Sequence, residues 1–174
     1  MAPPKMFSRF TSLLFISLLT LGFSPSASAQ NLRASTNCEA PPELALLNSQ
    51  ADSMPNGIIS AYSPEQINLD YPNLWWAKAQ FDIFGGRLIS DWFIYPEQKR
   101  IDLIVNRQLW SVLRYLDHYR LTNQFGTVAR TYGYNLRIFN QRQQCLGIYS
   151  CDFTESPNQC EIDVKPSGSG GFSL

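Results

Sequence analysis

The segment CDFTESPNQC, residues 151–160, constrains the C-terminal part of the chain more than any other feature, because two cysteines enclose a turn-like stretch. Side chains on one face of a strand alternate with period two, so the pairing of one residue fixes the pairing of its neighbours. The register that brings Cys151 opposite Cys160 also gathers small and apolar residues on one face: Gly147, Tyr149, Ile162 and Val164. Turn-forming residues from Thr154 to Pro157 close the loop. The segment therefore predicts a hairpin crosslinked by a Cys151–Cys160 disulfide.

The N-terminus has the layout of a secretory signal peptide. Lys5 and Arg9 precede an apolar run from Phe10 to Phe23, and Ala27-Ser28-Ala29 supplies a small-residue cleavage site. That run is shorter than the ~20 residues that span a bilayer, so we expect cleavage after Ala29 and no stable membrane span after signal removal. Residues 1–29 are thus predicted to be a signal peptide, which directs the chain out of the cytosol.

All four cysteines follow the predicted cleavage site, and an even number in an exported chain indicates disulfides. Zinc is the competing interpretation, but it favours closely spaced cysteine pairs supported by histidine, and the chain has 1 His. Cys145 and Cys151 are too far apart along one extended strand to bond to each other. A Cys38–Cys145 disulfide is the remaining pairing, and we expect neither a metal site nor a cofactor.

Removing residues 1–29 also removes two basic residues, which leaves 12 of the 14 Lys and Arg against 14 Asp and Glu. A nucleic-acid-binding domain needs a concentrated basic face, so this charge balance argues against nucleic acid as a partner. We predict a flexible leader at 30–42, a single domain at 43–165 and a disordered PSGSGG-containing tail at 166–174.

Apolar periodicity places short helices and hairpin strands along the domain. A capping pattern at 63–66 indicates one helix start, and helical spacing indicates further helices at 72–83, after Asn106 and at 124–132. The helix after Asn106 is expected to bury a stripe made of Leu109, Val112, Leu113 and Leu116. Strand-like segments lie at 87–95, 101–105, 134–140, 145–151 and 160–164. The predicted fold class is α+β: an antiparallel sheet of about five strands in two hairpin groups, with helices packed on one face.

Aromatic residues are the candidates for binding, because exposed tryptophans anchor partners or stack on sugars. Trp76, Trp110 and Arg114 form the predicted binding patch, with Arg114 four residues from Trp110 on the same helix. The alternative interpretation places tryptophans in the core, as expected for Trp75 and Trp92.

A catalytic alternative centres on His118 paired with one of the aspartates Asp91, Asp102 or Asp117. A solvent-facing histidine near a helix end explains His118 with no catalytic role, and charged outer positions explain the aspartates; these are the favoured interpretations. No GxSxG, Walker, GxGxxG or HExxH motif occurs in the chain, so no catalytic residue is assigned.

Three stretches, LWWAKAQF at 74–81, RIDLIVNRQLW at 100–110 and FGTVARTYGYNLRIFN at 125–140, resemble small exported cyanobacterial proteins with no assigned function. The resemblance covers about residues 72–164 and implies export across a cyanobacterial membrane, to the periplasm or the thylakoid lumen, with the extracellular space as the remaining exported compartment. It carries no catalytic residues to this chain. We therefore expect a non-enzymatic module that binds a protein or an envelope component through an aromatic patch, with a small hydrolase using His118 as the alternative.

Overall fold

The computed structural model describes residues 37–48, 54, 57–62, 73–154 and 156–165. The predicted signal peptide, the predicted helix start at 63–66 and the predicted tail lie outside these residues. Within them, no helix is both long enough and apolar enough to cross a membrane.

The architecture is α+β, with a sheet of six strands in chain order. The strands are β1 (Ile59–Ser60), β2 (Ile89–Tyr95), β3 (Arg100–Val105), β4 (Asn135–Asn140), β5 (Cys145–Asp152) and β6 (Gln159–Val164). The pairing is antiparallel except between β3 and β4, which are parallel. A parallel pair needs a crossover connection, and α3 (Arg107–Ser111) and α4 (Tyr115–Thr131) supply it. The sheet thus has one strand more than predicted and one parallel pair that the sequence did not indicate.

The C-terminal hairpin has the register expected from period-two alternation. Cys151 lies opposite Cys160, and the disulfide between them joins Cα atoms 4.0 Å apart. Residues paired along the same face are Tyr149 with Ile162 and Gly147 with Val164. Cys38 and Cys145 form the second disulfide. Two disulfides are consistent with an oxidising compartment.

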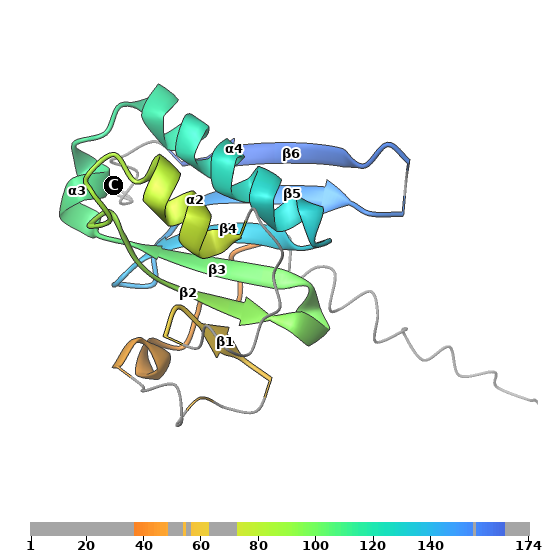
Figure 1. Cartoon of the computed structure of the whole chain (residues 1–174), viewed down its shortest axis with the longest axis horizontal. Helices are drawn as coiled ribbons and strands as arrows, with labels where there is room; N and C mark the ends of the chain where they lie inside the picture. Colours follow the sequence, from red (N-terminus) through yellow and green to blue (C-terminus); the bar gives the residue numbers. More distant parts are fainter. Residues whose placement is uncertain (1–36, 49–53, 55–56, 63–72, 155, 166–174) are drawn as a thin grey trace, which may run out of the picture.

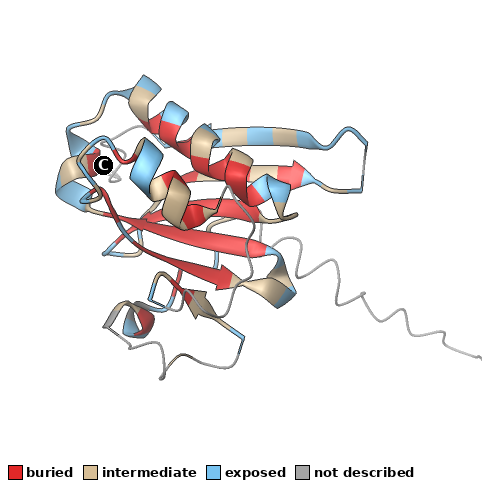
Figure 2. Cartoon of the chain, viewed as in Figure 1, coloured by how far each residue is buried: buried red, intermediate tan, exposed pale blue. Residues whose placement is uncertain are grey.

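The helices α2 (Leu74–Phe81) and α4 lie side by side on one face of the sheet (Figure 1). Asn73 caps α2 by accepting a hydrogen bond from the Trp76 backbone N–H at 2.9 Å. The main core lies between these helices and the sheet, and the strands β2, β3 and β4 are its most continuously buried elements (Figure 2).

A second, smaller core covers the opposite face of the sheet. Leu46, from the 3-10 helix η1 (Leu44–Asn48), packs there against Phe93, Ile104 and Phe139. Residues 37–42 belong to the predicted leader and are attached to the same face, since Pro42 is buried and its carbonyl accepts a hydrogen bond from Gln143 at 2.6 Å. We call residues 37–48 the N-terminal strap. Both faces of the sheet are therefore covered.

Two helix predictions were wrong in detail. The helix α2 buries Leu74 and Ala77 and ends at Phe81, so Ile83, the last residue of the helix predicted at 72–83, lies outside it and is exposed. The expected stripe after Asn106 is interrupted, because the chain leaves helix geometry between α3 and α4. Val112 and Leu116 are consequently exposed rather than buried.

Candidate functional site

Trp110 and His118 form a buried pair that holds α3 against α4. Their rings stack with centroids 4.2 Å apart and planes 12° apart, and their exposed fractions are 3% and 1%. The His118 Nε2 atom lies 2.9 Å from the Trp110 carbonyl oxygen. Because a carbonyl can only accept, Nε2–H is the donor in this contact. Neither residue is at the surface, which corrects the expectation of an exposed Trp110 and a solvent-facing His118.

The three aspartates considered as partners of His118 are each engaged elsewhere. Asp91 accepts hydrogen bonds from the backbone N–H groups of Trp92 and Ala61, and burial raises the pKa of its carboxyl. Asp102 binds arginine, and Asp117 accepts a hydrogen bond from Arg114, which lowers the pKa of the Asp117 carboxyl. In the described part of the chain, none of these carboxylates contacts the imidazole. The sequence had also suggested outer positions for Asp91 and Asp102, but both are buried.

Four apolar side chains gather where α3 passes into α4. They are between 43% and 69% exposed. Within α4, residues three or four positions apart are neighbours on the helix surface, and Val112 is the C-cap of α3, three residues before Tyr115. We call this set the tyrosine patch: Val112, Tyr115, Leu116 and Tyr119.

Packing against the core does not explain the tyrosine patch. The side of α4 that faces the sheet carries Leu121, Phe125, Val128 and Ala129, all buried. The opposite side of a surface helix is ordinarily polar, because apolar side chains there remain in water. Single exposed apolar residues need no explanation, but a contiguous group marks an interaction surface.

Charged side chains border the patch. The Arg114 Nε lies 3.1 Å from Asp117 Oδ2, and Arg120 lies 3.7 Å from Asp117 Oδ1. Both arginine side chains are largely exposed, at 85% and 69%. Two guanidinium groups share one carboxylate, so this border carries a net positive charge. Arg114 was predicted at the binding site, but its recorded partner is Asp117 rather than Trp110.

Trp76 lies on a separate groove between α2 and α4. Its ring packs edge-on against Phe81, with centroids 5.3 Å apart. The groove encloses about 250 Å³ and is otherwise lined by amide, hydroxyl and methyl groups of α4: Asn123, Gln124, Thr127, Val128 and Thr131. The predicted trio of Trp76, Trp110 and Arg114 is therefore divided between a groove, the core and the border of the tyrosine patch.

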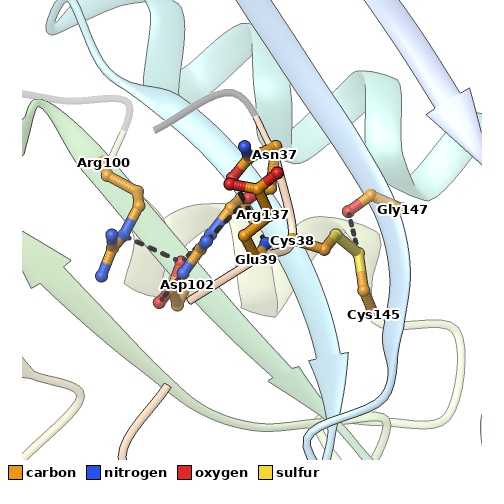
Figure 3. A network of polar contacts seen from close by, with 8 residues as sticks. All are labelled: Asn37, Cys38, Glu39, Arg100, Asp102, Arg137, Cys145 and Gly147. Atoms are coloured by element: carbon orange, nitrogen blue, oxygen red, sulfur yellow. Dashed lines mark hydrogen bonds and ion pairs between the residues drawn. A yellow bond between two sulfur atoms is a disulfide. The ribbon is translucent and has the colours of Figure 1, made fainter. Parts of the chain in front are cut away.

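The opposite face of the sheet holds a buried ionic cluster that the sequence did not indicate (Figure 3). Arg137 on β4 donates two 2.8 Å hydrogen bonds to Asp102 on β3, through Nε and Nη2. Arg100 lies 3.3 Å from the same carboxylate and 4.1 Å from the centroid of the Tyr95 ring. Burial, followed by the charge of Asp102, raises the pKa of Tyr95 to about 12.

The cluster also binds the N-terminal strap. Arg137 Nη1 donates a 2.8 Å hydrogen bond to the Asn37 carbonyl, beside the Cys38–Cys145 disulfide (Figure 3). The two principal side chains, Asp102 and Arg137, have no exposed surface. The arrangement attaches one segment to the sheet and leaves no access for a substrate to these two side chains.

The tyrosine patch was missed because Leu116 fits the apolar stripe of a longer helix in the sequence. One pattern in the sequence could have revealed the patch. His118, Leu121, Phe125 and Val128 recur at helical spacing and define the side of the helix that faces the core, which leaves Tyr115 and Tyr119 on other sides. No family model, curated protein or solved structure matches the chain. The arrangement of its own side chains is therefore what bears on its function.

Proposed function

We propose that the chain is an exported, non-enzymatic binding module that docks a protein of the cell envelope or lumen through the tyrosine patch. Export would place it in the periplasm, the thylakoid lumen or the extracellular space, and its two disulfides are consistent with such a compartment. The observation that carries the proposal is the exposure of four neighbouring apolar side chains beside two exposed arginines.

The composition of the patch suits a protein partner. Tyrosine and arginine are enriched among the residues that dominate binding energy at protein interfaces. Burying a side chain such as Leu116 or Val112 contributes on the order of 1.5–3 kcal/mol when burial is complete. A partner that covers the patch would gain this free energy, which an isolated chain leaves unused.

The border predicts the charge of the partner. Arg114 and Arg120 share the carboxylate of Asp117, so a partner surface with an apolar centre and an acidic rim is complementary to this region. Rim charges act mainly on the association rate and are screened by salt. Binding should therefore weaken as the ionic strength rises, and replacing both arginines with glutamine should reduce that dependence.

Site-specific photo-crosslinking tests the proposal. A photoreactive residue at Leu116, 67% exposed, should form a discrete crosslinked product with an acidic protein in native envelope or lumen extract. The same residue at Tyr62, 61% exposed and outside the patch, should not form that product. Equal crosslinking at both positions would indicate nonspecific contact and would contradict the proposal.

Two matched variants separate the patch from simple surface hydrophobicity. Leu116→Glu and Ile83→Glu alter side chains of nearly equal exposure, 67% and 68%, but only Leu116 belongs to the patch. In affinity capture without a photoreactive residue, Leu116→Glu should abolish recovery of the partner that crosslinking identifies, whereas Ile83→Glu and Trp76→Ala should preserve it. Loss of capture in Trp76→Ala alone would move the binding site to the groove between α2 and α4.

The hydrolase alternative has no comparable support. It required a carboxylate within hydrogen-bonding reach of His118. The recorded hydrogen-bond partner of the His118 ring is the Trp110 carbonyl. That contact supports a structural role, in which the stacked pair positions the turn that carries the tyrosine patch.

A further inference from the structure

A second cavity lies on the helix-covered side of the sheet, next to the β2–β3 turn. Its volume is about 230 Å³, which is small compared with the roughly 300–1,000 Å³ of drug-sized sites. At roughly 30 Å³ per non-hydrogen atom, taking water as the reference, it would hold about eight such atoms. Its walls are aliphatic: Ile59, Leu74, Ile94, Ile101, Val128 and Ala129.

The polar groups of this cavity lie on two turns that are paired with each other. Lys99 ends the 3-10 helix η4 (Pro96–Gln98) with φ 48° and ψ 47°, a left-handed conformation that is unfavourable for a residue with a side chain. Its backbone N–H donates to the Pro96 carbonyl at 3.2 Å, and its carbonyl accepts from the Asn135 N–H at 2.9 Å. These bonds fix the origin of the lysine side chain beside the cavity.

The second turn brings Tyr134 to the same place. Gly133 adopts φ 74° after the last turn of α4, and the Tyr134 N–H donates back to the Ala129 carbonyl at 3.1 Å. The Lys99 Nζ then lies 5.2 Å from the centroid of the Tyr134 ring. Burial raises the pKa of the Tyr134 phenol, so its hydroxyl remains a hydrogen-bond donor at neutral pH.

The Lys99 ammonium has no carboxylate at ion-pair distance among the residues that the structure describes. An apolar cavity with a cation and phenols among its lining residues therefore favours one class of ligand over others. Such a ligand has an alkyl or aryl body of limited size and a single negative charge at one end. A neutral hydrocarbon would leave the polar groups unused, and a dianion or a sugar would leave the aliphatic walls in contact with polar atoms.

We propose that this cavity is a binding site for a small amphiphilic carboxylate, with the carboxylate at Lys99 and Tyr134 and the apolar body against the aliphatic wall. The site is separate from the tyrosine patch, so it goes beyond the docking role proposed above. It gives the protein a second, small-molecule ligand class.

Calorimetric titration of the purified, oxidised protein with octanoate tests the proposal, because its alkyl chain is comparable in size to the cavity. Saturable binding with one site per chain is expected. Lys99→Gln should weaken octanoate binding about tenfold, the effect of losing one charge-assisted contact made by an exposed lysine, and should leave octanol binding unchanged. Lys165→Gln, which alters an exposed lysine at the end of β6, is the matched control and should bind octanoate normally.

A cavity-filling variant tests the location independently of charge. Ile59 lies on the short edge strand β1 and is only partly buried, so Ile59→Trp can fill the cavity with little disturbance of the core. It should abolish the binding of both octanoate and octanol while leaving the thermal transition cooperative. Absence of saturable octanoate binding, equal affinity in Lys99→Gln and the wild type, or unaltered binding in Ile59→Trp would each overturn the proposal.

Discussion

Replacing Asp102 with asparagine should destabilise the protein far more than the same replacement at Asp117. Each aspartate lies between two arginines, so the two sites have the same chemical groups. Asp102 has 0% side-chain exposure, as does its partner Arg137, whereas Asp117 lies on the surface of α4 beside two largely exposed arginines. Comparing the two substitutions isolates the effect of burial.

The expected magnitude follows from the geometry of the buried pair. Arg137 donates two hydrogen bonds, each 2.8 Å long, to the two oxygens of Asp102. Asparagine offers one acceptor oxygen and no charge, so Arg137 would keep one of these bonds and remain buried beside Arg100 without a counter-ion at position 102. Breaking one partner of a buried ion pair costs about 3–5 kcal/mol. That loss is a large part of the roughly 5–15 kcal/mol that stabilises a typical domain.

Urea denaturation without reductant measures the free energy of unfolding of each variant. With an m-value of ~2 kcal/mol per molar urea, the Asp102→Asn midpoint should fall by on the order of 2 M, whereas the Asp117→Asn midpoint should stay near that of the wild type. The double variant Asp102→Asn/Arg137→Met should be more stable than Asp102→Asn alone, because it removes the uncompensated charge. Equal and small shifts at both aspartates would refute the reasoning.

Three further outcomes are expected. Burial raises the pKa of Tyr95 to about 12, so the folded state favours its neutral phenol. The free energy of unfolding should therefore fall as the pH rises from about 10, the pKa of the phenol in the unfolded chain, towards 12. Denaturation measured across this pH range should show a smaller fall for Tyr95→Phe. Gly126→Ala should destabilise by about 1–3 kcal/mol in thermal melts, because its new Cβ would collide with the Tyr149 ring; an unchanged melting temperature would contradict this. Replacing Cys38 and Cys145 together by serine should cost ~4–5 kcal/mol in urea by the loop-entropy model, since the bond joins residues 107 apart; a negligible loss would show that the strap docks without it.

The predictable parts of the fold are those fixed by local periodicity. The Cys151–Cys160 register could be derived from the sequence because a period-two pattern and a turn determine it together. The same alternation divides β3 into a face with Leu103 and a face with Asp102. Alternation alone does not predict how far each face is buried. The face with Asp102 is buried because the N-terminal strap, distant in the sequence, covers it.

The unpredicted features depend on pairings between distant segments. The ionic cluster exists because β3 and β4 are parallel neighbours, which places Asp102 beside Arg137. Nothing in either strand specifies that neighbour. The tyrosine patch depends on a break in the helix before Tyr115, and the apolar spacing of Leu113 and Leu116 continued through that break in the sequence. Local patterns in the sequence could therefore predict the elements, but not the tertiary pairings that create the candidate sites.

The wide separation of Cys38 and Cys145 bears on how the molecule is made. Biosynthesis proceeds from the amino end, as the proposed export would, so Cys38 emerges long before its partner, 107 residues later. During that interval its thiol can react with small-molecule oxidants or with another chain. Cys151 and Cys160, 9 residues apart, emerge almost together and can couple at once. Attachment of the strap is thus a late event in maturation, and a cell lacking a disulfide isomerase should accumulate molecules in which only the second crosslink is correct.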